Sequence, residues 1–231
     1  MLARYYANAQ GRFLSVDPSG RSVSLQHPQT WNRFVYALNN PASRVDPDGR
    51  VSYLVSRDIP LTGNTKKHMF VVTGARYLGD VGPNVKVHSF GKRPDGTLGA
   101  KSPQSDTAQM DNDAWASLAT DSPIMDVDAV AIPAKDGKVR SYAEALIPSH
   151  DYSNESLGAE GTNSNTAAQA VANNAAGRDV EPPAPEDGLN GEQEEVPGTS
   201  RWREIQFDQQ RIKADEESGR HSHHQRHERN Q

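Results

Sequence analysis

Two polar side chains are placed where they could carry out acyl-transfer chemistry together. His68 opens the apolar run His-Met-Phe-Val-Val-Thr, which is typical of a strand, and Ser164 stands at the start of an Ala-rich stretch with helical character. The positive end of a helix dipole stabilises an anion, and an imidazole can accept the proton of a nucleophile. We therefore expect His68 to act as a base towards Ser164, with Asp128 orienting the imidazole.

Other residues could take the same roles. His88 lies in a second alternating strand and is an alternative base, while Asp126 is an alternative to Asp128. A purely structural interpretation also exists, because Asn and Ser side chains readily cap helices and form local turns. In that interpretation His68 is a strand-edge residue that bonds to backbone, and Ser164 belongs to a helix cap.

The chain has no cysteine, and this narrows the chemistry. Disulfides, thiolate metal sites and a cysteine nucleophile are excluded, so a serine would need a well-placed base. The sequence has no P-loop, no dinucleotide-binding fingerprint and no His-Glu-x-x-His motif, so we expect no cofactor. The His-rich run at 221–227 lacks carboxylate and cysteine partners, and we expect a solvated tail there, with no metal site.

The elements that must position these residues mix strands and helices. We predict strands at 68–73, 85–90 and 126–132, a short helix at 113–119, and a clearer helix at 166–176. Ser164 or Asn165 would be the N-cap of that last helix, and Gly177 would stand at its C-terminal cap position. Because no βαβ repeat is visible, the pattern favours an α+β fold: a small mixed antiparallel sheet with a few short helices.

Composition divides the 231 residues into three zones. Only 34% of residues are apolar and the mean hydropathy is −0.80, so a core cannot extend along the whole chain. Residues 1–50 are rich in β and turn signals, and residues 51–177 are the best candidate for an independent fold. Residues 178–231 begin with an acidic, Pro-rich segment and end in a polar tail, which we expect to be largely disordered.

Charge and hydropathy also limit the partners. A net charge of −5 makes nucleic acid an improbable ligand, and no apolar run is long enough to span a bilayer. The first residues lack the apolar segment of a secretory signal peptide. We therefore expect no export through a secretory signal at this end of the chain.

Five motifs follow one another closely in the first fifty residues: Arg4-Tyr5-Tyr6, Gly11-Arg12-Phe13-Leu14-Ser15, Asp17-Pro18, Tyr36-Ala37-Leu38-Asn39-Asn40-Pro41 and Val45-Asp46-Pro47-Asp48-Gly49. Together they strongly resemble the RHS repeat-associated core domain, over about residues 3–50. In that family the motif ends a large YD-repeat shell and precedes a variable C-terminal toxin. The resemblance implies a polymorphic toxin of bacterial competition, with the upstream shell and a cognate immunity protein as partners. It also implies that the chain is secreted or delivered only as part of a larger RHS system, and is otherwise cytoplasmic in the bacterium.

The same resemblance implies self-cleavage. Core domains of this family are described as aspartyl proteases that cut directly after the second Asp-Pro-x-Gly. Residue by residue, this points to Asp17 and Asp46 as the two carboxylates, with a cut after Arg50. The sequence departs from the family at Arg50, where a hydrophobic residue is usual, and the YD repeats that would hold both aspartates are not part of it.

A second resemblance concerns residues 51–177, which take the place of the toxin and are the candidate effector domain. A base that precedes its nucleophile in sequence is the order found in circularly permuted papain-like hydrolases. The runs His68-Met69-Phe70-Val71-Val72, Ser89-Phe90-Gly91, Asn163-Ser164-Asn165-Thr166 and Ala176-Gly177 also look like a C-terminal domain carried by other RHS proteins. This resemblance implies a hydrolase or acyltransferase in which Ser164 replaces the usual cysteine.

Two other classes of function remain open. A nuclease toxin would need histidine and carboxylate ligands for a divalent ion, and His150 and Asp151 could supply them with Asp111, Asp113 or Asp121. A non-enzymatic remnant would only fold and bind an immunity partner. Mutating His68 or Ser164 would then have no effect.

Overall fold

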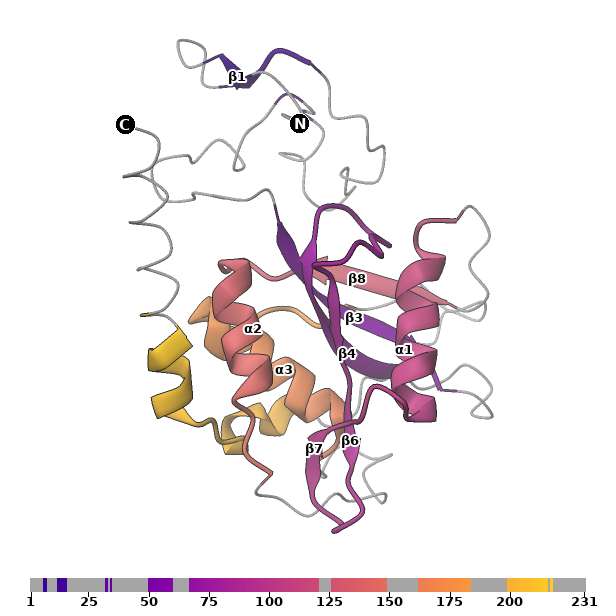
Figure 1. Ribbon diagram of the computed structural model, residues 1–231, viewed down its shortest axis with the longest axis vertical. Helices are drawn as coiled ribbons and strands as arrows, with labels where there is room; N and C mark the ends of the chain where they lie inside the picture. The colour runs from indigo at the N-terminus through magenta and orange to yellow at the C-terminus, as the bar shows by residue number, and fades with distance from the viewer. Residues whose placement is uncertain are drawn as a thin grey trace.

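The computed structural model describes residues 6–7, 12–15, 32, 34, 50–59, 67–120, 126–148, 162–183, 199–215 and 217 (Figure 1). The named elements, in chain order, are β1 (Tyr6–Ala7), β2 (Arg12–Phe13), β3 (Val51–Asp58), β4 (Lys67–Ala75), β5 (Lys86–His88), β6 (Phe90–Lys92), β7 (Leu98–Ala100), α1 (Asp106–Ser117), β8 (Val127–Ala131), α2 (Asp136–Glu144), α3 (Ser164–Ala176) and η5 (Thr199–Glu204). Strands and helices are mixed, and the predicted α+β class is confirmed.

The main sheet has four strands in the order β5-β4-β3-β8, and each neighbouring pair is antiparallel. β3 and β4 lie in the middle and are buried along most of their length. Their residues are rich in Val, Leu, Met and Phe, as expected of strands covered on both faces. The pair Arg57↔His68 belongs to this central register. β6 and β7 form a separate two-stranded sheet.

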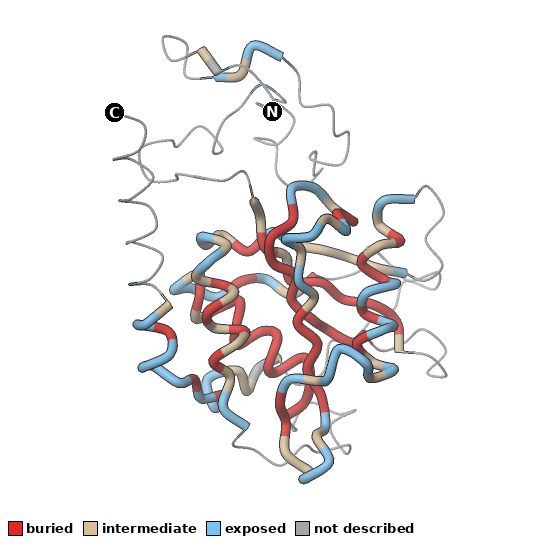
Figure 2. The backbone as a smooth tube through the Cα atoms, in the orientation of Figure 1, coloured by how far each residue is buried: buried red, intermediate tan, exposed pale blue. Residues whose placement is uncertain are grey.

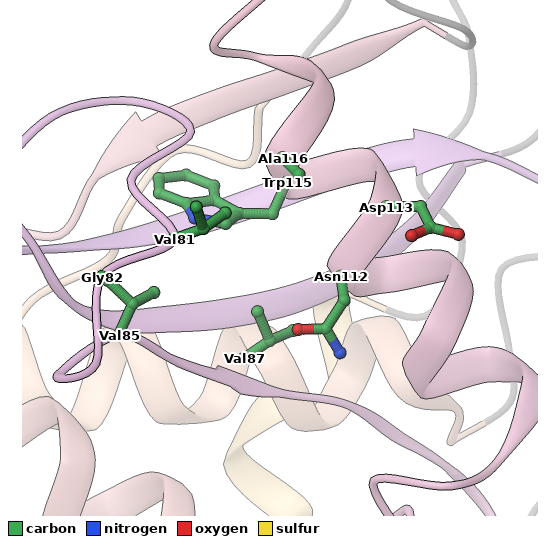
Figure 3. A pocket seen from close by; sticks show the side chains of 8 residues that line it. All are labelled: Val81, Gly82, Val85, Val87, Asn112, Asp113, Trp115 and Ala116. Atoms are coloured by element: carbon green, nitrogen blue, oxygen red, sulfur yellow. The ribbon is translucent and has the colours of Figure 1, made fainter.

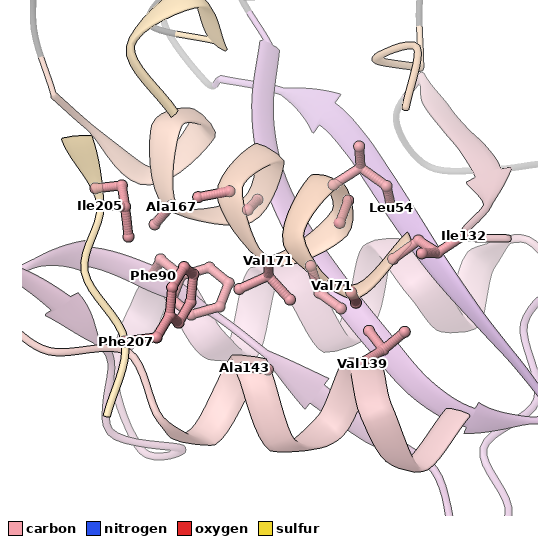
Figure 4. Packing of buried hydrophobic residues seen from close by; sticks show 14 of the residues in the cluster. Leu54, Val71, Phe90, Ile132, Val139, Ala143, Ala167, Val171, Ile205 and Phe207 are labelled. Carbon is pink, nitrogen blue, oxygen red and sulfur yellow. The ribbon is translucent and has the colours of Figure 1, made fainter. Parts of the chain in front are cut away.

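Helices cover both faces of the main sheet. In Figure 1, α1 lies on one side of the sheet, while α2 and α3 lie on the other. Side chains alternate between these faces along each strand. Leu54 and Val71 pack in the larger core with α2 and α3, whereas Val55 and Val72 pack in a smaller core with Trp115 of α1. Figure 2 shows the buried residues concentrated in the central strands and α3, and Figure 4 shows the packing of the larger core.

The chain after α3 contributes to the same core. Ile205, Phe207 and Ile212 are 4–8% exposed and pack with the residues of α2 and α3. Phe207 also meets Tyr142 edge to face, with ring centroids 5.1 Å apart. The predicted end of the effector domain at residue 177 is therefore too early. Sequence patterning missed this because the three residues concerned are spaced irregularly behind an acidic, Pro-rich stretch.

Several predicted bounds shift for physical reasons. The strand predicted to end at Gly74 continues to Ala75, because Gly74 takes a positive φ of 79° beside a register shift. The predicted strand at 85–90 is split between β5 and β6. The helix around Trp115 begins seven residues earlier than predicted, where the Ser105 side chain caps it. β3, β7 and α2 were not predicted.

The N-terminal zone is described only in short pieces. β1 and β2 pair antiparallel, with Tyr6 opposite Phe13 and Ala7 opposite Arg12. Asp17 and Asp46 lie outside the described residues, so the predicted self-cleavage stays a prediction. Within the described part of the chain, no helix is long and apolar enough to cross a membrane.

Candidate active site

Ser164 is the first residue of α3, and its neighbours fix it there. The side chain of Asn163 is the N-cap and accepts hydrogen bonds from the backbone N–H groups of Asn165 and Thr166. The Thr166 hydroxyl accepts in return from the backbone N–H of Asn163, which completes a capping box. The helix was predicted to have Ser164 or Asn165 as its N-cap. The cap is instead one residue earlier, and this leaves the Ser164 side chain free for other contacts.

His68 reaches Ser164 from the sheet. Its Nδ1 lies 2.8 Å from the Ser164 hydroxyl oxygen, although 96 residues separate the two in sequence. Both side chains are largely buried, His68 at 8% and Ser164 at 7% exposure. The structure thus brings together the predicted base and nucleophile within hydrogen-bond distance, which is the geometry that general-base activation requires. Their catalytic role stays a prediction.

The other imidazole nitrogen faces a carboxylate. Asp111, which is fully buried on α1, has its Oδ2 3.2 Å from His68 Nε2. Its second oxygen, Oδ1, accepts a hydrogen bond of 2.7 Å from Arg57 Nε. Arg57 comes from β3 and is also buried. Four residues from four elements therefore form one continuous chain of contacts: Ser164, His68, Asp111 and Arg57.

Asp128, which was predicted to orient the imidazole, is placed differently from Asp111. Asp128 lies on β8 opposite Ser56 of β3, which in turn lies opposite Met69 of β4. Residues paired in this way point to the same face of a sheet, and His68, next to Met69, points to the other face. The strand alternation therefore keeps Asp128 away from the His68 ring. Asp111 holds the orienting position instead.

Charges at the site are balanced. Burial by itself raises the pKa of Asp111, but the hydrogen bond from His68 and the positive charge of Arg57 outweigh it, so the pKa lies below its ordinary value of 3.8. An ionised Asp111 only accepts hydrogen bonds, so His68 Nε2 must carry the proton that points at it. In the neutral ring, Nδ1 is then a free acceptor for the Ser164 hydroxyl proton.

An anion formed next to Ser164 would meet a free donor. The first N–H groups of a helix have no partner within the helix. The backbone N–H groups of Asn165 and Thr166 donate to the Asn163 side chain, and the backbone N–H of Ala167 donates to the Asn163 carbonyl. Among the described residues, the Ser164 backbone N–H has no such partner, and it points from the positive end of the helix dipole. It is suited to donate to an oxyanion.

The alternative assignments are placed elsewhere. His88 is buried and its Nε2 lies 3.0 Å from the Thr73 hydroxyl. Burial and the nearby Lys86 lower the pKa of His88 to about 3, although Glu144 acts in the opposite direction. Asp126 pairs with Lys67 at 2.9 Å. Neither residue contacts His68 or Ser164.

The residues of the nuclease interpretation are only partly described. Asp121, His150 and Asp151 lie outside the described residues. Asp111 and Asp113 are both on α1 but two positions apart, so Asp111 is buried and Asp113 is exposed. Within the described ranges, no group of three His, Cys, Asp or Glu side chains could hold a metal ion. The His-rich run at 221–227 also lies outside them.

A hollow of about 250 Å³ lies on another side of α1 (Figure 3). Val81, Val85, Val87 and Trp115 give it an apolar wall, and Asn112 and Asp113 add polar groups. Neither Ser164 nor His68 lines this hollow. It is therefore separate from the candidate active site.

Sequence reasoning missed the site role of two residues, Arg57 and Asp111. Asp111 had been considered only as a metal ligand. A signal for it existed, because Ala108, Asp111 and Trp115 share one helical face and the other two are apolar. A carboxylate on the buried face of a helix needs a partner. Arg57 gave no such signal, since β3 had not been recognised.

No family model matches the chain, and no curated protein and no solved structure is significantly similar to it.

Proposed function

We propose that the effector domain is a serine-dependent hydrolase or acyltransferase of permuted papain-like type, at the C-terminal end of a bacterial RHS-family toxin. One observation carries the enzymatic part: the contact of 2.8 Å between Ser164 and His68, continued at 3.2 Å to a buried, ionised Asp111. Nucleophile, base and orienting carboxylate are the three groups that define such a triad, whatever the fold or the order in sequence.

The first chemical step follows from these positions. The Ser164 oxygen attacks the carbonyl carbon of an acyl substrate while His68 Nδ1 takes the hydroxyl proton. The imidazolium that forms is stabilised by Asp111, which stays ionised. Negative charge on the former carbonyl oxygen is stabilised by the Ser164 backbone N–H at the helix terminus.

The second step releases the product. When the tetrahedral intermediate collapses, the leaving group takes the proton from His68, and an ester forms between the acyl group and Ser164. His68 then takes a proton from a water molecule or another acceptor as it attacks the ester, and returns this proton to the Ser164 oxygen when the ester bond breaks. Water as acceptor makes the domain a hydrolase, and an amine or hydroxyl as acceptor makes it an acyltransferase.

The toxin part of the proposal rests on the RHS resemblance of residues 3–50. β3, a central strand, begins at Val51, directly after the expected cut. Cleavage after Arg50 would thus leave the described elements of the effector domain intact. An immunity protein and the upstream shell are the partners that this proposal implies.

A growth assay tests the proposal. The full chain is expressed in a bacterial host as wild type and as Ser164→Ala, His68→Ala and Asp111→Asn. Ser141→Ala is the matched control, because Ser141 is equally buried but lies on α2, where its hydroxyl bonds to the Gly137 carbonyl. Circular dichroism confirms that each variant folds.

We expect the wild type and Ser141→Ala to stop growth and the three site variants to be harmless. Toxicity that survives Ser164→Ala in a folded protein would exclude this site. Absence of toxicity from every form, together with no acyl-transfer reactivity of Ser164, would favour the binding-only interpretation.

A further inference from the structure

Two different partners form hydrogen bonds with the backbone along the edge of β4 that faces α3. Backbone groups of alternate residues point to the same edge of a strand, so Lys67, Met69, Val71 and Thr73 share one edge. β5 pairs with β4 from Val71 to Thr73, with His88 opposite Val71. β5 ends at His88, and the next strand, β6, belongs to a different sheet. Another group must therefore bond to β4 nearer to His68.

The side chain of Asn165 takes this place. Its Oδ1 accepts a hydrogen bond of 2.6 Å from the Met69 backbone N–H, and its Nδ2 donates one of 2.9 Å to the Lys67 carbonyl. These two backbone groups flank His68. A carboxamide has the same donor and acceptor as a peptide group, so Asn165 bonds to the strand as a neighbouring strand would. Its side chain is 2% exposed, which makes both bonds costly to lose.

We propose that Asn165 is a positioning residue of the active site, which clamps the backbone on both sides of His68 to the helix turn that carries Ser164. Asn165 directly follows Ser164 in sequence, so the clamp links the nucleophile to its base across 96 residues. The inference rests on the proposed function and deepens it. An alanine cannot make either bond, and a serine is too short to make both.

The absence of cysteine from the sequence provides a direct readout. Ser164→Cys in the full chain introduces a single thiol, whose alkylation rate by iodoacetamide as a function of pH gives its pKa. A free thiol has a pKa of about 8.5, and a nearby imidazolium or helix N-terminus lowers it by one to several units. The lowered value measures how closely His68 is held against residue 164, which a merely structural residue would not affect.

Three variants of the full chain are compared: Ser164→Cys alone, Ser164→Cys combined with Asn165→Ala, and Ser164→Cys combined with Asn173→Ala. Asn173 is the matched control, because it is a buried asparagine of α3 that bonds to Gln169 and the Val180 N–H, far from the site. We expect Asn165→Ala to raise the thiol pKa by about one unit or more towards 8.5, and Asn173→Ala to leave it unchanged. Asn165→Ser replaces Asn165→Ala if the latter does not fold, with the same expected rise.

An unchanged thiol pKa in the Asn165 variant would overturn the clamp, as would an equal rise in the Asn173 variant. If Ser164→Cys by itself has an ordinary thiol pKa, the proposed function fails, and hydrogen exchange of the Met69 amide then decides the clamp alone. Faster exchange in Asn165→Ala than in Asn173→Ala supports it, and equal exchange contradicts it.

Discussion

Each residue of the run Asn163-Ser164-Asn165-Thr166 has a separate task at the start of α3. Asn163 and Thr166 complete the capping box, Ser164 meets His68, and Asn165 bonds to the strand. The same four residue types would serve an ordinary helix cap, which is why sequence alone left both interpretations open. What distinguishes them is the contact with His68, and that contact depends on the fold of two distant segments.

The buried His88 leads to a prediction of how stability depends on pH. Burial first, and then Lys86, lower its pKa from 6.5 to about 3, so the ring is neutral in the folded protein. As pH falls below 6.5, His88 binds a proton in the unfolded chain, whereas in the folded protein it binds one only near pH 3. This residue therefore makes stability fall by about 1.4 kcal/mol per pH unit from 6.5 down to about 3.

His88→Gln removes this dependence. Urea unfolding at pH 7 and pH 5 should show wild type losing about 2 kcal/mol more than the variant between the two values. A loss of equal size in both proteins would contradict the assignment of a neutral, buried His88.

The two ends of α3 matter for the site because its first residue is the proposed nucleophile. α3 begins at Ser164 and ends at Gly177, whose left-handed φ of 68° closes the last turn. We expect Gly177→Ala to lower the free energy of unfolding by about 1 kcal/mol, because a side chain disfavours that conformation. Gly137→Ala is the control, since Gly137 is helical in α2 with open space around it, and it should raise stability by about 0.5–1 kcal/mol. Urea unfolding measures both, and equal signs would contradict the assignment of the cap.

Periodicity and capping rules were sufficient for the elements that hold His68 and Ser164. The continuous apolar run with its β-branched residues revealed β4, and the Ala-rich run with its Gly cap revealed α3. β3 escaped notice, although it is central, because Ser52, Ser56, Arg57 and Asp58 interrupt its apolar residues. Arg57 and Asp111 are buried only because each neutralises the other across two elements. Pairings of this kind depend on three-dimensional proximity, which residue patterns along the chain do not report.

At the scale of the whole molecule, the folded unit extends past the acidic segment. A chain that stops after Gly177 loses Ile205, Phe207 and Ile212 from the larger core. Each such side chain contributes about 2 kcal/mol when buried, and the sum is comparable with the total stability of a small domain.

We therefore expect the chain that stops after Gly177 to melt without a cooperative transition, whereas one that stops after Glu217 melts like the full chain. Thermal circular dichroism compares the three forms. A chain ending at Gly177 with an unchanged midpoint would show that residues 199–215 do not belong to the folded unit.

The most direct test of the account is covalent labelling of the full chain with a fluorophosphonate, followed by mass spectrometry of the peptide that contains Ser164. Labelling requires the activated hydroxyl and releases fluoride, and it needs no knowledge of the natural substrate. We expect wild type to be labelled at Ser164, His68→Ala to be unreactive, and Asp111→Asn to react about 10² to 10⁴ times more slowly. Asp128→Asn should react like wild type, because Asp128 faces away from His68. Wild type that is not labelled at Ser164, or His68→Ala that is labelled as fast as wild type, would contradict the assignment of Ser164 as a nucleophile activated by His68.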